Sequence, residues 1–202
     1  MAAGVVASSA QVYSANVVGY YNVTLPAGQL VATANQLVNS TSNDVATLLA
    51  GLPNKTTVDT WTGSGFASTE KLGGAWSPDP VIGNGQGFFI QTPATAGTLS
   101  NTFVGSVAVN VGASTTNSLA GGILTLVGSA VPYSTDLNDT NNTLNTSLLP
   151  NKTTIDVWNG SGYTTTERLG GSWSPDLTIS VGQGFFVQPP ATGATWVQTL
   201  NP

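Results

Sequence analysis

Asp59 and Glu70 are the residues whose type and spacing best suit chemistry, and they recur 97 positions later as Asp156 and Glu167. A carboxylate pair is the set that glycosidases use for acid–base work on a sugar. The chain has no His and no Cys, which excludes imidazole and thiolate chemistry and disulfides. Since a glycosidase normally uses one such pair in a catalytic domain, two intact copies favour a cross-strand hydrogen-bond or ion-pair set. We predict a protein that is not an enzyme and has no cofactor.

Two Gly-Gly-x-Trp-Ser-Pro-Asp segments hold the second candidate set, Trp76 with Asp79 and Trp173 with Asp176. An exposed indole beside a carboxylate suits a sugar ring, so these four residues are a candidate ligand or assembly surface. Trp is more often buried, and the alternative is an indole that caps a small core and donates its N–H to a loop carbonyl. The Asp after Ser-Pro would then accept a local turn hydrogen bond.

The chain contains its own copy. Residues 53–95 and 150–192 align without a gap at an offset of 97, and 29 of the 43 positions are identical. This period is too long for a solenoid repeat and fits a small domain. We therefore expect β-domains at 13–106 and 107–202. The apolar segment around 103–113 is no flexible linker, so the two modules should pack together.

Short strand-like runs separated by Gly, Pro and Asn dominate both copies. They predict an all-β protein of two tandem sandwich-like or barrel-like domains, each with at most one short helix, near Asp44–Ala50 in the first. Core residues are expected at Val58, Leu72, Phe89 and Ile90 and at their counterparts. Gly85-Gln86-Gly87 and its repeat lack the features of a phosphate-binding loop and predict a turn entering a buried strand. The remaining strands are expected near 16–24, 29–34, 56–61, 66–72, 86–91, 98–104, 107–111, 123–127, 153–158, 163–169, 183–188 and 194–199.

Residues 1–12 begin with small apolar residues that end in Ser-Ser-Ala. This pattern is typical of the end of a secretory signal peptide, although the basic start is missing; the alternative is an apolar N-terminal arm. The uncharged segment Val5–Val18 would leave apolar surface exposed, so we expect part of Ala10–Val18 to pair as a strand in its own module or in a neighbouring copy. The candidate assembly strand comprises Gln11, Val12, Tyr13, Val17 and Val18.

Charged residues make up only 6% of the chain, with a net charge of −5 and four basic residues. So few basic residues cannot form a phosphate-binding stripe, which argues against nucleic acid as a partner. No apolar run approaches the roughly 20 residues of a membrane helix, so we expect no membrane span. A neutral composition rich in hydroxyl groups is typical of secreted or cell-surface proteins, and weak charge repulsion favours self-association.

Several motifs carry a resemblance to a known kind of module. They are Asn16–Tyr20, Leu25–Gly28, the Thr-Trp-x-Gly-x-Gly-Phe hairpin, Gly-Gly-x-Trp-Ser-Pro-Asp and Gly-Gln-Gly-Phe-Phe. Together they resemble tandem β-rich modules of uncharacterised secreted proteins from Verrucomicrobia-like bacteria, related in style to surface-protein modules of Bacteroidetes. The resemblance implies bacterial export and an all-β fold, and it supplies no catalytic or binding residue.

These observations together predict an extracellular structural protein that assembles with itself into a filament or surface layer. β-Proteins polymerise readily when a strand is added at an open sheet edge. The partner is then another copy of the chain. The alternative is a carbohydrate-binding or adhesive module that holds a polysaccharide through Trp76 and Trp173.

Overall fold

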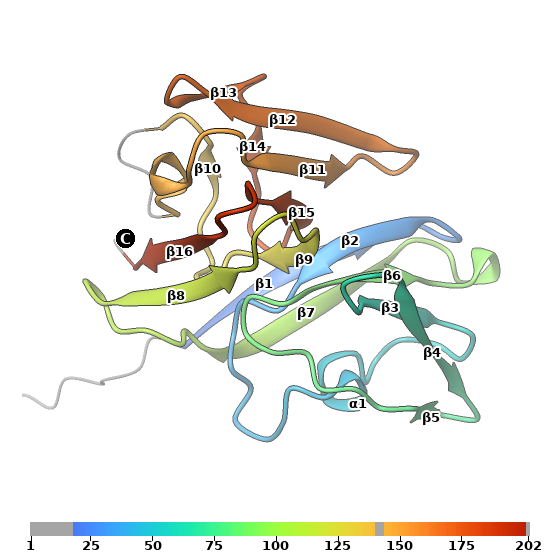
Figure 1. Ribbon diagram of the computed structural model, residues 1–202. Helices are drawn as coiled ribbons and strands as arrows, with labels where there is room; N and C mark the ends of the chain where they lie inside the picture. Colours follow the sequence, from blue (N-terminus) through green and yellow to red (C-terminus); the bar gives the residue numbers. More distant parts are fainter. Residues whose placement is uncertain (1–17, 140–143, 201–202) are drawn as a thin grey trace, which may run out of the picture.

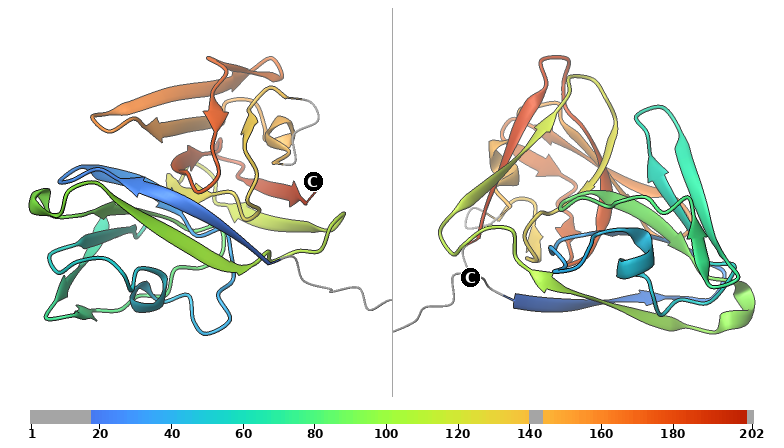
Figure 2. Two further views of the ribbon diagram at one scale, coloured as in Figure 1. Left: turned by 180° about the vertical axis from the view of Figure 1, so that it is seen from behind. Right: turned by 90° about the horizontal axis from the view of Figure 1, so that it is seen from below.

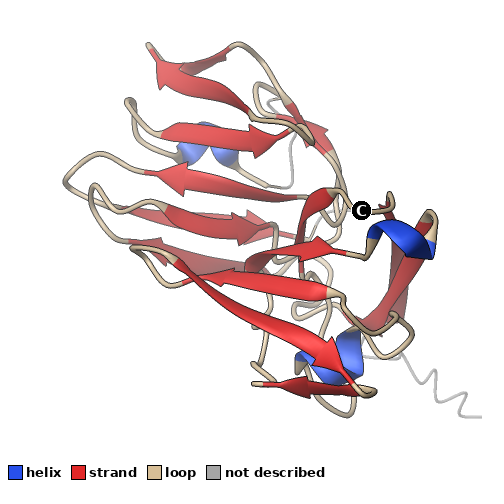
Figure 3. Ribbon diagram, turned by 90° about the vertical axis from the view of Figure 1, so that its right-hand side faces the viewer, coloured by secondary structure: helices blue, strands red, loops and turns tan. Residues whose placement is uncertain are grey.

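The computed structural model describes residues 18–139 and 144–200, and strands make up nearly all of its regular structure (Figure 1 and Figure 3). Two five-stranded sheets and three two-stranded pairs account for these strands. The all-β fold expected from the sequence is therefore confirmed. None of the described sheets closes on itself, so the barrel-like alternative does not apply.

The first module is a five-stranded sheet with the order β2-β6-β3-β4-β5, covered by a long antiparallel ribbon of β1 and β7 (blue and green in Figure 2). Its sheet strands pair antiparallel throughout. Its elements are β1 (Val18–Leu25), β2 (Leu30–Ala34), α1 (Val45–Leu48), β3 (Thr57–Trp61), β4 (Phe66–Leu72), β5 (Ala75–Ser77), β6 (Gly87–Gln91), η1 (Ala94–Ala96) and β7 (Leu99–Ser106).

The second module repeats this plan, with the sheet order β9-β15-β11-β12-β13 and a ribbon of β8 and β16. Trp61 of β3 pairs with Phe66, and Trp158 of β11 pairs with Tyr163 in the same register. The common strand order confirms the duplication. The elements are β8 (Ser114–Leu119), β9 (Thr125–Gly128), β10 (Thr135–Asp136), η2 (Thr146–Leu148), β11 (Thr154–Trp158), β12 (Tyr163–Leu169), β13 (Ser172–Ser174), β14 (Thr178–Ile179), β15 (Gly184–Gln188) and β16 (Ala194–Thr199).

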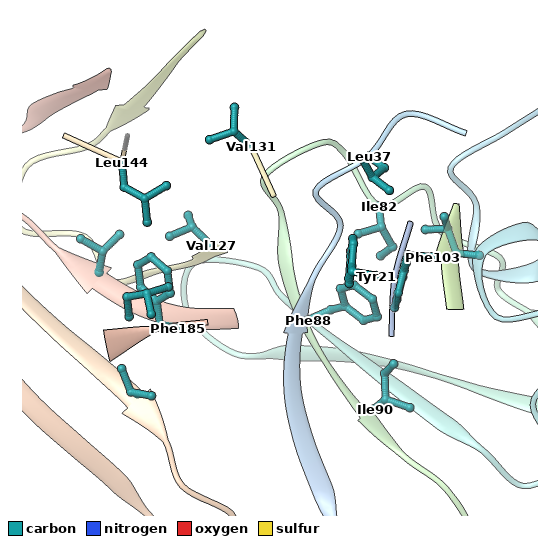
Figure 4. Packing of buried hydrophobic residues seen from close by; sticks show 14 of the residues in the cluster. Tyr21, Leu37, Ile82, Phe88, Ile90, Phe103, Val127, Val131, Leu144 and Phe185 are labelled. Carbon is teal, nitrogen blue, oxygen red and sulfur yellow. The ribbon is translucent and has the colours of Figure 1, made fainter. Parts of the chain in front are cut away.

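Adjacent Phe residues on the central strands face opposite sides of their sheets, as strand geometry requires. Phe88 and Phe185 point into the cores of their own modules, where Phe88 lies near Tyr21 and Phe103 (Figure 4). Phe89 and Phe186 point the other way and form a second buried cluster with Leu126. Each sheet is therefore buried on one face by its own module and in part on the other face by its twin.

Two leucines that the sequence placed in the core are exposed, Leu72 by 60% and Leu169 by 52%. In the first module the neighbouring Lys71 lies inside instead, with 8% exposure. Because strand side chains alternate, burying Lys71 together with Thr69 turns Leu72 outward. The expected burial of Val58, Phe89 and Ile90 is confirmed.

Two expected elements differ in place or detail. The strand near 107–111 does not form; the chain turns there, and the hydroxyl-rich β8 starts at Ser114 because it pairs with β16. The short helix α1 forms as expected, but neither Ser42 nor Asn43 caps it. The Asp44 carboxylate does so, accepting a hydrogen bond of 2.7 Å from the Thr47 amide.

The two modules are joined by a reciprocal pair of hydrogen bonds. The indole N–H of Trp61 donates to the carbonyl of Leu124 in the other module at 2.8 Å. The indole N–H of Trp158 donates to the carbonyl of Leu30, also at 2.8 Å. Figure 1 shows the consequence: β2, β9, β6 and β15 meet in the middle, with β11–β13 above them and β3–β5 below.

Where the two modules meet, the backbones approach so closely that several positions have no room for a larger side chain. The Ala34 amide donates to the Gly182 carbonyl, and the Gly128 amide donates to the Gly85 carbonyl, both at 3.0 Å. A Cβ atom on Gly184 would lie 2.3 Å from the Thr33 carbonyl oxygen. At Gly128 an added Cβ would lie 2.1 Å from the Cβ of Ala34. The two residues occupy corresponding places in the two sheets, at the ends of β9 and β2, and only one of them can carry a methyl group.

Tyr21 connects the β1–β7 ribbon to the end of β2 and the residues that follow it. Its ring stacks on Phe103 with centroids 4.9 Å apart, and its hydroxyl donates to the Ala34 carbonyl at 2.6 Å. The Gln36 amide donates to the same hydroxyl at 3.2 Å. Burial raises the pKa of the Tyr21 hydroxyl well above its ordinary value, and the Gln36 hydrogen bond offsets only part of that rise.

We predict that Gly128→Ala lowers the free energy of unfolding by about 1–3 kcal/mol, because its methyl group collides with Ala34. The swapped double variant Ala34→Gly/Gly128→Ala removes that collision and should regain most of the loss. Denaturant unfolding measures both. A double variant no more stable than Gly128→Ala would show that the two positions do not share one space.

We also predict that the hydroxyl of Tyr21 makes the protein less stable at alkaline pH. Its folded pKa lies above the unfolded value near 10, so its contribution is complete below about pH 10 and is lost as the pH rises, by about 1.4 kcal/mol per pH unit. Tyr21→Phe should flatten this slope in denaturant unfolding between about pH 10 and 12. Tyr20→Phe, on the exposed side of the same strand, is the control; equal slopes in both variants would refute the assignment.

Candidate functional site

The two candidate tryptophans lie inside the protein. Trp76 on β5 is 7% exposed and Trp173 on β13 is 3% exposed, and both belong to the main core cluster. The expectation that they form a ligand or assembly surface is therefore wrong, because neither ring presents a face to solvent. The core alternative is right about burial but not about the indole N–H, which has no hydrogen-bond partner in the described part of the chain in either copy.

The aspartates next to these tryptophans connect distant segments. The Asp79 carboxylate accepts a hydrogen bond of 2.9 Å from the amide of Ala46, in α1. Asp176 accepts one of 3.1 Å from the amide of Asn138, whose side chain exchanges two hydrogen bonds with the backbone of Trp173. The expected local turn bond is thus replaced by a long-range one. Both carboxylates act on backbone groups, which accounts for their repetition without a ligand.

The carboxylate pairs lie on the sheet faces that point away from the cores of their own modules, the same faces that carry Phe89 and Phe186. Asp59 faces Ser68 across the strands and accepts its hydroxyl hydrogen bond, and Asp156 accepts one of 2.5 Å from Thr165. Glu70 lies opposite Thr57, one pair further along the same face. This is the cross-strand hydrogen-bond set that the sequence favoured over acid–base work.

In each hairpin, a basic residue donates hydrogen bonds to the loop that precedes the hairpin. Lys71 donates from its ammonium group to the carbonyls of Ala50 and Leu52, at 2.8 and 2.9 Å. Arg168, its counterpart, donates to the carbonyl of Ser147 at 2.6 Å and to the side-chain oxygen of Asn151 at 3.1 Å. Lys71 and Arg168 therefore both donate hydrogen bonds within the fold.

The outward face of the β1–β7 ribbon is the first surface that the fold leaves unused. Tyr20 is 73% exposed and stands directly across from Val104, while Val18 lies one pair away, across from Ser106. Asn22 accepts a hydrogen bond of 2.6 Å from the Thr102 hydroxyl on the same face. We call this surface the ribbon face; none of its residues is charged, and they are Val18, Tyr20, Asn22, Thr24, Ser100, Thr102, Val104 and Ser106.

Val18 is the one residue of the candidate assembly strand that the structure describes. It begins β1 and pairs with Ser106 of its own module, as the in-module alternative expected. The other four residues, Gln11, Val12, Tyr13 and Val17, lie outside the described residues.

The second unused surface is a small cavity between the two hairpins. It has a volume of about 200 Å³ and draws its walls from both modules. Sequence reasoning missed it, because its residues belong to four separate stretches that meet only across the junction. The signal was present as an aromatic residue at each hairpin loop in both copies. We call it the aromatic cavity, and it is lined by Trp61, Phe66, Leu124, Asp156, Tyr163 and Phe186.

We predict that Lys71→Met lowers the free energy of unfolding by about 1–3 kcal/mol, because two carbonyl groups lose a charged donor. Lys55→Met is the matched control: Lys55 is exposed, so the same change should cost no more than about 0.5 kcal/mol. Thermal unfolding of the two variants tests this difference. Equal losses would mean that the contacts of Lys71 contribute nothing beyond its charge.

Among residues 18–139 and 144–200, no three His, Cys, Asp or Glu side chains gather closely enough to hold a metal ion. The same stretches contain no helix long and apolar enough to cross a membrane. Comparison with protein-family models, curated proteins and solved structures finds no match to this chain. The resemblance to secreted bacterial modules therefore stays a prediction.

Proposed function

We propose that this chain is a structural protein without catalytic activity that works outside the cell and assembles with copies of itself through the ribbon face and the free edge of β1. The observation that carries the proposal is the uncharged, partly apolar ribbon face beside an open strand edge. Val18, Tyr20 and Val104 are exposed by 71%, 73% and 51% and stand together at one end of it. Apolar groups gathered in this way are typical of interaction surfaces.

The edge of β1 offers main-chain hydrogen bonds to an added strand. Within the described residues, β1 pairs with β7 alone, so its second edge has no strand partner. Proteins usually protect such edges with Lys, Pro or a bulge, and the eight residues of β1 include neither Lys nor Pro. An incoming strand could therefore extend the ribbon.

A second copy of the chain is the partner that fits this surface best. The ribbon face has no charge with which to select a basic or acidic partner, and the chain as a whole is only 6% charged. The corresponding ribbon of β8 and β16 is also uncharged on its outer side. Pairing of β1 with β1 would close a dimer, whereas pairing of β1 with the β8–β16 ribbon of the next copy leaves another β1 free and continues as a polymer.

A location outside the cell is supported by the composition rather than by the fold. The chain is rich in Ser, Thr, Asn and Gly and poor in charge, and residues 1–12 carry the Ser-Ser-Ala pattern. We do not propose the polysaccharide-binding role through Trp76 and Trp173, since both rings are buried.

The test is assembly of the purified chain, measured by light scattering and by negative-stain electron microscopy. We expect ordered polymers from the unaltered chain and monomers from Tyr20→Lys, because a charge beside the open edge opposes strand addition. Leu148→Lys is the matched control: Leu148 is 65% exposed but lies in the other module, so this variant should still polymerise. Both variants should keep their free energy of unfolding within about 0.5 kcal/mol.

Two outcomes would contradict the proposal, and a third would change the kind of assembly. An unaltered chain that stays monomeric at high concentration has no assembly function of this kind. If Tyr20→Lys forms the same polymers as the unaltered chain, the contact lies elsewhere. If the chain forms only a closed dimer, the assembly is a β1–β1 pair and not a filament or surface layer.

A further inference from the structure

The aromatic cavity has a floor and three walls made of rings. Phe186 is the buried floor; its centroid lies 5.3 Å from that of Trp61, 6.4 Å from that of Phe66 and 5.8 Å from that of Tyr163. Phe66 and Tyr163 remain 48% and 46% exposed, so solvent reaches this part of the lining. Since the N–H of Trp61 is used by the Leu124 carbonyl, this indole offers a ligand only its ring.

One carboxylate provides the charge of this site. Asp156 lines the cavity and already accepts the hydroxyl hydrogen bond of Thr165 at 2.5 Å. Burial, and then the negative charge of Asp156, raise the pKa of the Tyr163 hydroxyl. No basic side chain is among the residues that line the cavity, so a cation that enters meets one negative charge and no positive one.

The chemistry of the lining selects among ligands. A sugar needs many hydrogen-bond partners, and here the lining side chains offer a carboxylate and a phenol hydroxyl beside four apolar rings and a leucine. A primary ammonium group has three N–H donors to satisfy and would leave some unpaired. A cation without N–H donors requires only ring faces and an opposite charge, which is the recognition used for methylated ammonium groups.

We propose that the aromatic cavity binds a quaternary ammonium group, held against the rings of Trp61, Phe66 and Tyr163 and neutralised by Asp156. This site is independent of assembly, because none of its lining residues belongs to the ribbon face. The group could come from a choline-type small molecule or from a trimethylated lysine of another protein. Its chemistry is the same in both cases.

The experiment follows the Trp61 indole and Tyr163 ring resonances by NMR during titration with choline. We expect a saturable change with a dissociation constant of about 1 mM. The neutral isostere 3,3-dimethylbutanol should bind about ten-fold more weakly, since it has the shape but not the charge. Nε-trimethyllysine amide, acetylated at its α-amino group, presents the same cation from the second source; the tighter of the two cations identifies the source, and binding of either supports the site.

Asp156→Asn should weaken choline binding by about ten-fold while keeping an acceptor for Thr165. Asp59→Asn is the matched control: it removes the same charge from the corresponding hairpin and should leave the affinity within about two-fold. Tyr163→Leu, which removes one wall, provides a second loss-of-binding variant. Unchanged thermal unfolding shows that each variant is folded.

Several results would overturn the proposal. If choline and its neutral isostere bind equally, the charge plays no part in binding, and a cation site is refuted. Equal losses in Asp156→Asn and Asp59→Asn would remove the site from this cavity. A saturable response to methyl glucoside with none to choline would make it a sugar site instead.

Discussion

The two indole hydrogen bonds that cross between the modules set the geometry on which the rest of the structure depends. Trp61 reaches the Leu124 carbonyl, and Trp158 reaches the Leu30 carbonyl, so each module satisfies a backbone group at the sheet edge of the other. This exchange brings β2 and β9 so close that only one of Ala34 and Gly128 can carry a Cβ atom. It also buries Phe89 and Phe186, which would otherwise lie on an open sheet face.

The scarcity of charge has a structural explanation in the same duplication. Lys71 and Arg168 donate to loop backbone carbonyls, while Asp79 and Asp176 accept hydrogen bonds from backbone amides of distant segments. These charges therefore act within each module. The two proposed surfaces do not use these four side chains: one is an uncharged ribbon, and the other is a cavity formed where the modules meet.

The two proposed surfaces also show how a duplicated protein can acquire distinct sites. The β1–β7 ribbon carries Tyr20 and Val104 on its outer face, whereas the β8–β16 ribbon is dominated by Ser and Thr. Phe66 on one hairpin corresponds to Tyr163 on the other. Such differences between copies allow head-to-tail contacts and a single-sided cavity, neither of which two identical modules in a symmetric arrangement would favour.

Much of the fold could be predicted from the sequence, because its determinants are local. The repeat, the glycine-rich hairpins and the alternation of Phe88 and Phe89 all follow from spacing along the chain. The structural role of the Asp59 carboxylate was likewise predictable, since a second intact copy argued against a single active site. Strand period 2 determines which residues share a face wherever the strand itself is recognised.

What period 2 does not determine is which face becomes buried, and only the tertiary structure decided that. Leu72 points outward because Lys71 can reach two loop carbonyls from the inner face. Trp76 lies in the core, although its spacing beside Asp79 also allowed a surface platform. The aromatic cavity depends on residues up to 125 positions apart along the chain that meet only when the modules pack. Burial and proximity are properties of packed surfaces, and short-range spacing in a single sequence does not encode them.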